Sequence, residues 1–390
     1  MFIDYQIAVI GAGIVGASIA ARLASTGVSV ALIDKGAAGS LGASSYSGGL
    51  VRLYDSDPLL MELAAWSIGL MNEGVFAATY ASALRRTGVI YRAAPDQLTP
   101  IRNAIERYAS ERYPMRLIAG RELDGKHFPR CAAGERINLY EPGACVGNVR
   151  QAVTALANLV RQEGLLLEHC EVKAIECRSH DEVWLSLGQA TLRCQAVVVA
   201  AGAWSPRWLA DAGLQSRSIP LARVLTDGDW SMPVIDEVTQ SYGVPLTRRI
   251  IQTGCGYRNT AASPETLAPP DARHVEDAFA RIGHLLQPSS DAPQHRVLDV
   301  VPGFDCYSPD GRPVLGFESG DSPLYFATGM SGLGFKLAPG VAQIACEQLQ
   351  GRLAGAVPPG RWKAFSPSRL MHGGAAAARH AAAQAASVQP

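Results

Sequence analysis

The chain has 390 residues, of which 48% are hydrophobic, and its formal net charge is zero. This length and composition predict a folded protein with two lobes rather than one small domain. The balanced charge gives no reason to expect nucleic acid or a membrane surface as a partner, and no stretch is apolar and long enough to predict a membrane span.

The first predicted unit is a strand, a glycine-rich turn, a helix and a second strand. YQIAVI is an apolar run that ends at Gly11, IVGASIAARLAST has helical spacing, and VSVALID is a second buried strand that ends at Asp34. Gly11, Gly13 and Gly16 have the spacing of a dinucleotide fingerprint, with the acidic residue about twenty positions later. Gly13 would let the backbone approach a pyrophosphate at the helix N-terminus, and Asp34 would accept hydrogen bonds from a ribose and disfavour NADP.

The middle of the chain has a less regular pattern. Helical pieces alternate with loops over residues 80–141, and an amphipathic helix is predicted over 148–164. Residues 165–205 then predict successive strands that end in VVVAAGAWS, and 241–259 predict further strands. Ligands of a doubly wound sheet bind beyond the carboxyl ends of its strands, so this run brings a second glycine turn to the first.

Near the C-terminal end, residues 324–351 predict a strand, the loop GMSGLGFKLAPGV and a helix. The backbone amides of the loop and the positive end of the helix would face a negative group. A reduced flavin carries negative charge around N1 and C2=O, whereas a nicotinamide cofactor would leave this segment unexplained. We therefore expect FAD rather than NAD.

These elements predict an α/β protein with a Rossmann-like FAD-binding domain and a β-sheet-based substrate domain. The predicted boundaries are 1–80, 142–215 and 310–370 for the FAD-binding domain, 81–141 and 216–309 for the substrate domain, and 371–390 for a disordered tail.

The eight cysteines form no C-x-x-C pair, so the sequence predicts neither a metal site nor a disulfide framework. We interpret most of them as buried thiols of a protein in a reducing cytoplasm. The N-terminal stretch MFIDYQ lacks the basic region of a signal peptide, which agrees with a cytoplasmic protein.

Taken together, the Gly11–Asp34 fingerprint, AAGAW and GMSGLGFKLAPGV resemble the FAD-dependent amino-acid oxidase family. The pattern is most similar to monomeric sarcosine oxidase and glycine oxidase-like enzymes, and it covers about residues 5–370. The resemblance implies an architecture like that of p-hydroxybenzoate hydroxylase. It also implies hydride transfer from the carbon beside an amine nitrogen to flavin N5, hydrolysis of the imine, and reduction of oxygen to hydrogen peroxide.

The fingerprint and the resemblance together predict the residues that contact FAD. They are Gly11, Gly13, Ile14, Val15, Gly16, Asp34, Lys35, Ser44, Ser45, Gly49, Leu50, Val172, Ala201, Gly202, Trp204, Gly329, Ser331, Gly332, Gly334, Phe335 and Lys336. The cysteine that ties FAD to sarcosine oxidase is matched by Asp305, so we expect non-covalent FAD. A thioether to the neighbouring Cys306 stays open.

The resemblance also implies a substrate site. Arg52 and Lys336 match two residues that bind the substrate carboxylate, and a guanidinium fork beside an ammonium suits that group. Tyr307 matches a tyrosine that lines the substrate pocket. The alternatives are an ion pair of Arg52 with Asp55 or Asp57, and a packed aromatic role for the tyrosine.

Besides Asp305, two further positions depart from the pattern of the resemblance. An arginine of the flavin environment is matched by Gly49, and the lysine that activates oxygen is matched by Gln252, with Arg248, Arg249 or Arg258 nearby. Loss of a fixed positive charge beside the flavin would slow the reaction with oxygen unless an arginine substitutes.

The leading hypothesis is therefore an FAD-dependent oxidase of an amino acid or N-substituted amino acid. The alternatives are an amine or amino-acid dehydrogenase with a non-oxygen acceptor, and a flavin-binding subunit of a larger complex. The expected partners are a small amine substrate and oxygen or another electron acceptor. The sequence identifies neither the substrate, nor a catalytic base, nor the oligomeric state.

Overall fold

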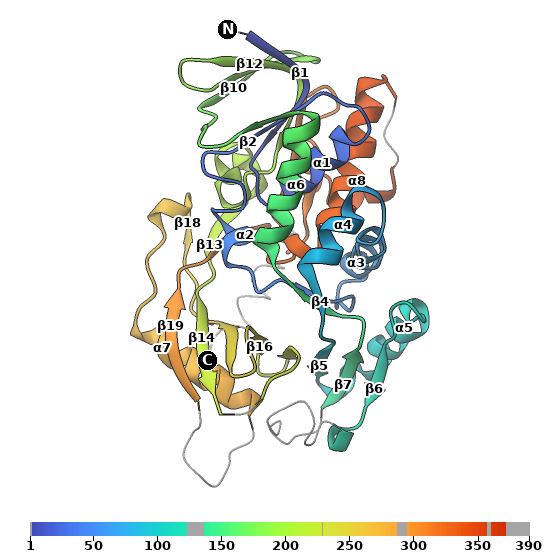
Figure 1. The fold of residues 1–390 in the computed structure, drawn as a ribbon, viewed down its shortest axis with the longest axis vertical. Coiled ribbons are helices and arrows are strands. Elements are labelled where there is room, and N and C mark those ends of the chain that lie inside the picture. Colours follow the sequence, from blue (N-terminus) through green and yellow to red (C-terminus); the bar gives the residue numbers. More distant parts are fainter. Residues whose placement is uncertain (1, 123–135, 228, 287–294, 357–359, 372–390) are drawn as a thin grey trace.

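The structure, a computed structural model, describes residues 2–122, 136–227, 229–286, 295–356 and 360–371 (Figure 1). Its two large sheets lie toward opposite ends of the long axis, with the N-terminal strand in the upper one. The predicted tail falls almost entirely outside the described residues, which end at Met371.

The upper sheet is built around a parallel core in the order β9–β2–β1–β12–β22, with β21 antiparallel at one edge and the β10–β11 hairpin beside β12. Its strands are β1 (Phe2–Ile10), β2 (Val30–Ile33), β9 (Leu165–Leu167), β10 (Ala174–Ser179), β11 (Glu182–Ser186), β12 (Thr191–Val199), β21 (Val314–Phe317) and β22 (Leu324–Thr328). Because the core strands run parallel, the turns after β1, β2, β12 and β22 meet at one edge.

Three helices cover one face of this sheet: α1 (Ile14–Ala24), α6 (Val149–Glu163) and α8 (Gly334–Leu353) (Figure 1). In α1 every residue except Arg22 is buried, because the helix lies between the sheet and its two neighbours. The α6 helix is amphipathic as predicted, and the Asn148 side chain caps it by accepting a hydrogen bond from the Gln151 amide. On the outside of α8 packs α3 (Pro58–Leu70), which is followed by α4 (Gly74–Ala83).

The lower sheet has the order β19–β14–β17–β16–β15–β5–β7–β6 and is antiparallel except between β15 and β5. Its strands are β5 (Val89–Ala93), β6 (Arg116–Ile118), β7 (Ile137–Glu141), β14 (Leu221–Thr226), β15 (Val234–Asp236), β16 (Ser241–Pro245), β17 (Ile250–Gly254) and β19 (His295–Val301). Helix α7 (Ala272–Leu285) packs on one face against residues such as Ile251. Neighbours in sequence alternate between faces, so Gln252 points to the other face.

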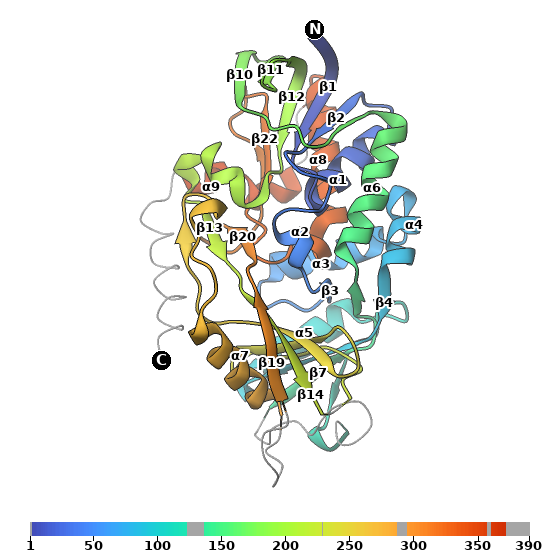
Figure 2. The ribbon, with the colours of Figure 1, turned by 60° about the vertical axis from the view of Figure 1, so that its left-hand side comes forward.

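Two small sheets connect the large ones (Figure 2). One contains β13 (Gln215–Ser218), β18 (Thr260–Ala261) and β20 (Phe304–Tyr307), and the other contains β3 (Leu50–Val51), β4 (Leu84–Arg86) and β8 (Cys145–Gly147). The remaining α-helices of the described chain are α2 (Ala43–Tyr46), α5 (Leu98–Tyr108) and α9 (Ser368–Met371).

The predicted α/β class is confirmed, with a parallel Rossmann-like sheet and a second, mainly antiparallel sheet. The domain boundaries themselves stay a prediction. The expectation of only helical pieces and loops over 80–141 is wrong, because β5, β6 and β7 lie there and belong to the lower sheet. Within the described residues, no helix combines the length and the hydropathy that a membrane crossing needs.

Candidate active site

A cavity of about 500 Å³ lies where the carboxyl edge of the upper sheet meets the lower sheet. Its size is that of a ligand site, and its position is the one that doubly wound sheets use for ligands. The residues that were predicted to contact FAD and that line it are Gly11, Gly13, Ile14, Val15, Asp34, Lys35, Ser44, Gly49, Leu50, Val172, Ala201, Gly202, Trp204, Gly329, Gly332, Gly334, Phe335 and Lys336. Gly16, Ser45 and Ser331 do not line it.

The first glycine turn leaves open space in front of α1. Gly11 has a φ of 104°, and a Cβ on it would lie 2.5 Å from the Ala200 carbonyl oxygen. A Cβ on Gly16 would lie 1.8 Å from the Gly11 oxygen, so this glycine permits the packing of helix on strand without facing the cavity. The Ser44 hydroxyl accepts a hydrogen bond from the Ile14 amide at 3.0 Å. This uncrowded helix N-terminus suits the pyrophosphate of a dinucleotide.

Asp34 follows β2 and closes the same turn. One carboxylate oxygen accepts a hydrogen bond from the Ala12 amide at 2.6 Å, and the other accepts one from Gly36 at 2.8 Å. Burial raises the pKa of Asp34, while these two donors oppose the shift. Each oxygen keeps a second lone pair, so the carboxylate can still accept from a ribose hydroxyl.

Lys35 and Trp204, which both line the cavity, contact each other and share Glu265 as a partner. The Lys35 ammonium lies 3.9 Å from the centroid of the Trp204 ring and 3.0 Å from a carboxylate oxygen of Glu265. The Trp204 indole donates to the same oxygen at 2.6 Å. Glu265 was missed by the sequence analysis because it is far from both partners in the chain and has no motif of its own.

The loop between β22 and α8 forms the opposite wall. The first residues of α8, Gly334, Phe335 and Lys336, line the cavity, and its N-cap residue Leu333 offers no side-chain cap. The first amides of this helix are therefore available to a negative group, as the loop predicts. Ser331 instead points its hydroxyl toward Gly329 and Ser308, which explains why it does not face the cavity.

Gly49 has no room for the arginine that the resemblance places there. Its φ is 68°, and a Cβ would lie 1.9 Å from the carbonyl oxygen of Gly147 in β8. The close backbone approach between β3 and β8 therefore requires glycine at this position.

Asp305, at the position of the flavin-linking cysteine, is a buried carboxylate on β20. It accepts hydrogen bonds from the amides of Cys306 at 2.7 Å and Gly332 at 2.9 Å, and so holds the loop before α8. Burial raises the pKa of Asp305 to about 6, although both amides oppose the shift. The charge of Asp305 therefore changes around pH 6, within the range in which the stability of a protein is readily measured.

This carboxyl group predicts a pH dependence of stability. Its pKa is higher in the folded chain than in the unfolded one, so the folded state binds more protons and loses stability as the pH rises from about 4 to about 6. Relative to Asp305→Asn, we expect the FAD-free wild-type protein to lose about 2–3 kcal/mol across this range. Urea unfolding of both proteins between pH 4 and pH 7 measures the free energy of unfolding at each pH. A constant difference between the two proteins across this range would refute the prediction.

Arg52 and Lys336 line the cavity as a pair of cationic side chains, and Asp55 is the partner of Lys336. Lys336 is 4% exposed, and its ammonium lies 3.0 Å from an oxygen of Asp55. Burial lowers the pKa of Lys336, which Asp55 counteracts. Burial raises the pKa of Asp55, but Lys336 and then Arg52 outweigh it and hold that pKa below its usual value. The two side chains therefore each stabilise the charged form of the other.

The alternative ion pair of Arg52 with Asp55 or Asp57 is not formed. Arg52 donates to the Tyr54 carbonyl and lies 5.1 Å from the centroid of the Tyr91 ring. Asp55 pairs with Lys336, and Asp57 caps α3 and pairs with Arg312. The guanidinium therefore keeps donors for a ligand.

Glu141 holds the segment that carries Arg52. Its carboxylate is fully buried and accepts hydrogen bonds from the Leu53 amide at 2.7 Å and the Tyr113 hydroxyl at 2.8 Å. It also accepts from the Tyr54 amide at 3.3 Å. The backbone on the C-terminal side of Arg52 is thus fixed by a residue that the sequence analysis did not identify.

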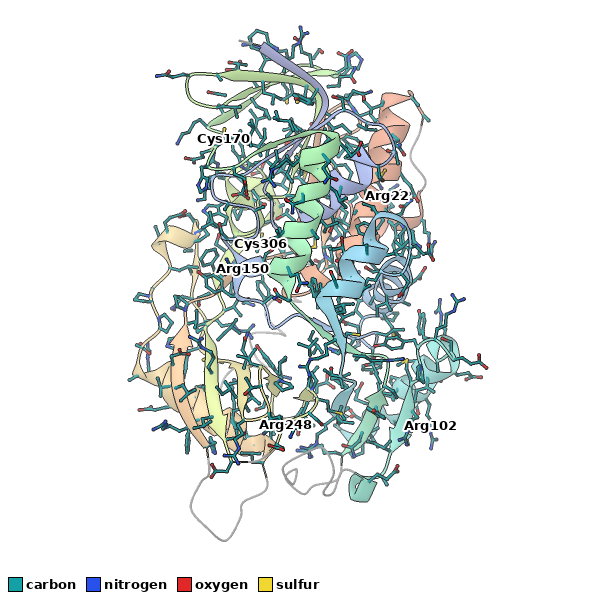
Figure 3. All side chains as sticks on the ribbon, in the orientation of Figure 1. Arg22, Arg102, Arg150, Cys170, Arg248 and Cys306 are labelled. Carbon is teal, nitrogen blue, oxygen red and sulfur yellow. The ribbon has the colours of Figure 1, made fainter. Side chains whose placement is uncertain are left out.

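Tyr307 and Gln252 line the cavity from β20 and β17. The Gln252 side-chain amide donates to the Tyr46 carbonyl at 3.1 Å. Among the three arginines considered near it, Arg258 lines the cavity, whereas Arg248 and Arg249 are exposed in the β16–β17 turn (Figure 3). Tyr242 also lines the cavity and was missed, because nothing in its local sequence indicates which face of β16 it occupies.

A glycine-rich dinucleotide cradle that shares one cavity with an antiparallel sheet defines a dinucleotide-dependent oxidoreductase. The family model described as FAD dependent oxidoreductase matches residues 6–348, and the chain belongs to this family. The predicted family and the FAD dependence are confirmed. Within the described residues, no group of three or more His, Cys, Asp or Glu side chains is arranged to hold a metal ion.

Known proteins similar to this chain include oxidases and dehydrogenases. The glycine oxidase of Geobacillus kaustophilus is 26% identical over 86% of this chain and 90% of its own length, and that of Pseudomonas aeruginosa is 26% identical over 89% and 95%. The structure of L-proline dehydrogenase from P. horikoshii superimposes with a TM-score of 0.80 at 22% identity, over 96% of this chain and 99% of that one. The Geobacillus glycine oxidase structure gives a TM-score of 0.76 at 22% identity, over 93% and 98%.

Proposed function

We propose that this protein oxidises the carbon–nitrogen bond of an amino acid or an N-substituted amino acid. The observation that carries the proposal is the placement of two cationic side chains, half-buried Arg52 and buried Lys336, in the cavity that the glycine turns of the FAD domain also line. A carboxylate held there would keep the neighbouring amine inside the cavity. The glycine oxidase relatives support the same substrate class.

The residues of the chain would act by binding and by charge. Arg52 would donate to the substrate carboxylate, and Lys336 would add a fixed positive charge beside it. The same charges would lower the pKa of the substrate ammonium and so favour the neutral amine. No histidine lines the described cavity, which agrees with loss of the amine proton to water.

The bonds that change lie in the substrate. The C–H bond beside nitrogen breaks, its hydrogen leaves with both bonding electrons, and the nitrogen lone pair forms the C=N bond. Water then hydrolyses the iminium product to a carbonyl compound and a free amine or ammonia. FAD, when bound, supplies the acceptor for the hydride.

Non-covalent binding of FAD is the second part of the proposal. Cys306 is among the residues that line the cavity and lies between the two large sheets (Figure 3), but its side chain is 1% exposed and packs in the hydrophobic core of the upper sheet. Burial raises the pKa of its thiol to about 12. A thioether requires the thiolate, so this environment disfavours a covalent link.

Oxygen is the acceptor that the resemblance implies, but one feature favours a second candidate. Gln252 is neutral, and Lys336, which also lines the cavity, is already paired with Asp55. Unless Arg52 or Arg258, which also line the cavity, supplies a fixed positive charge, oxygen reduction would be slow, and a dehydrogenase with another acceptor becomes the alternative.

Anaerobic mixing of the FAD-loaded protein with a panel of amino acids and N-methyl amino acids tests the proposal. We expect one class of amine to bleach the visible flavin band, and admission of air then reports the reaction with oxygen. Fast recovery would establish an oxidase, and slow recovery a dehydrogenase. Tightly bound FAD that no amine in the panel bleaches would refute the proposed function and favour a flavin-binding subunit.

A further inference from the structure

The substrate half of the cavity contains two guanidinium groups without a salt bridge. Arg52 and Arg258 both line it, and neither forms an ion pair with a carboxylate of the described residues. The nearest cavity-lining carboxylate on β20, Asp305, is instead occupied by the amides of Cys306 and Gly332. Guanidinium groups at a ligand cavity commonly bind carboxylates in a bidentate geometry.

Arg258 has neighbours that suit an anion. Together with Tyr242 and Tyr307 it lines the cavity, and its charge acts on the ionisation of both phenols. Burial raises the pKa of Tyr242 to about 12 and also raises the pKa of Tyr307, so both phenols are neutral donors near neutral pH. The guanidinium of another arginine, Arg217, lies 4.8 Å from the centroid of the Tyr307 ring.

The guanidinium groups of Arg52 and Arg258 lie over different parts of the lower sheet. Arg52 lies against Tyr91 on β5, 5.1 Å from the centroid of its ring. Arg258 follows β17, which β16 and β15 separate from β5. Neighbouring strands are about 4.8 Å apart, so the two arginines belong to positions roughly 14 Å apart across the sheet, and the cavity offers two separate anion-binding positions.

We propose that the substrate carries two carboxylates, one held by Arg52 and Lys336 and the other by Arg258, Tyr242 and Tyr307. The substrate class is then an aminodicarboxylic acid or an N-carboxyalkyl amino acid. This inference rests on the proposed function, because it names the substrate of the same site. Arg258 is exposed at the cavity edge, so we expect its contribution to be moderate.

The experiment compares dicarboxylic acids with neutral analogues of similar shape. The FAD-loaded protein is mixed anaerobically with both enantiomers of aspartate and its amide asparagine, and of glutamate and its amide glutamine. A third pair is N-carboxymethylglycine and sarcosine, which lacks the second carboxylate. We expect flavin reduction, measured as the rate constant divided by the dissociation constant, to favour the acid by about 3- to 10-fold. Arg258→Met should remove that preference by lowering the values for the acids toward those for the amides.

The matched control is Arg248→Met, which removes an arginine from the exposed turn of the same sheet (Figure 3). It should leave both rates unchanged. Amides that react as fast as acids in the wild type would overturn the inference. Equal losses for acid and amide in Arg258→Met would also overturn it. Arg258 would then bind the carboxylate that the acid and the amide share, rather than a second one.

A binding measurement separates failure of this inference from failure of the proposed function. Glutarate and butyrate cannot be oxidised at a C–N bond, and their binding is followed by the shift of the flavin spectrum. We expect glutarate to bind about 3- to 10-fold more tightly than butyrate, and Arg258→Met to remove the difference. If no amine reduces the flavin, this result still decides the inference, and equal affinities would refute it.

Discussion

Replacing Arg52 by methionine should lower flavin reduction by a carboxylated amine roughly 30- to 1000-fold, measured as the rate constant divided by the dissociation constant. The guanidinium is the carboxylate binder of the proposed site that no salt bridge occupies. Lys336 is a poorer target, because its removal would leave Asp55 buried without a partner and destabilise the fold. Anaerobic stopped-flow absorbance of the FAD-loaded variant gives the result.

Two controls separate carboxylate binding from structural damage. An amine without a carboxylate should be oxidised at similar rates by the wild type and the variant, since it makes no use of the guanidinium. Arg102→Met removes an exposed arginine on α5, far from the cavity, and should change neither reaction (Figure 3). If Arg52→Met oxidises the carboxylated amine at the wild-type rate, the proposed substrate site is wrong.

Changing Gln252 to lysine should raise the rate constant for flavin reoxidation by oxygen roughly 100- to 1000-fold. The side chain lies on the cavity face of β17, 9% exposed, and a lysine there would place a positive charge where superoxide first forms. The Tyr46 carbonyl, which now accepts from the glutamine amide, would accept from the ammonium. Mixing the reduced protein with oxygenated buffer measures the effect.

Gln252→Met is the matched control for this prediction. It keeps the size and the neutrality of the glutamine, so its reaction with oxygen should be no faster than that of the wild type. A lysine variant that also reacts no faster would show that charge at this position does not limit the reaction. Access of oxygen to the flavin, or the charge of Arg258, would then be the next factor to test.

Local pattern was sufficient to predict the parts of the fold with short-range order. The β1–α1–β2 unit is predictable because two apolar runs flank a glycine turn, and α6 because its apolar residues recur at helical spacing. Strand β5 was missed because Arg92, although buried, interrupts its short apolar run VIYRA. Its partners β7 and β15 lie further along the chain and give no local signal.

The candidate site is predicted best where backbone groups, rather than side chains, line the cofactor cavity. Glycine turns have a sequence signature, and all but one of the glycines predicted to contact FAD, Gly16, line the cavity. Side-chain partners have no such signature. Proximity in the sequence makes Asp55 an alternative partner of Arg52, yet Asp55 pairs with Lys336, which is 281 positions away. Glu265 reaches Lys35 across 230 positions in the same way.

The order of the strands has a consequence for protein synthesis. The parallel core takes β1 and β2 from the start of the chain, β12 from its middle, and β22, with α8 after it, from residues beyond 323. A nascent chain therefore lacks one wall of the cofactor cavity until α8 has left the ribosome. We therefore expect the complete FAD site to form only after the lower sheet has been synthesised, although the first glycine turn is among the earliest segments of the chain.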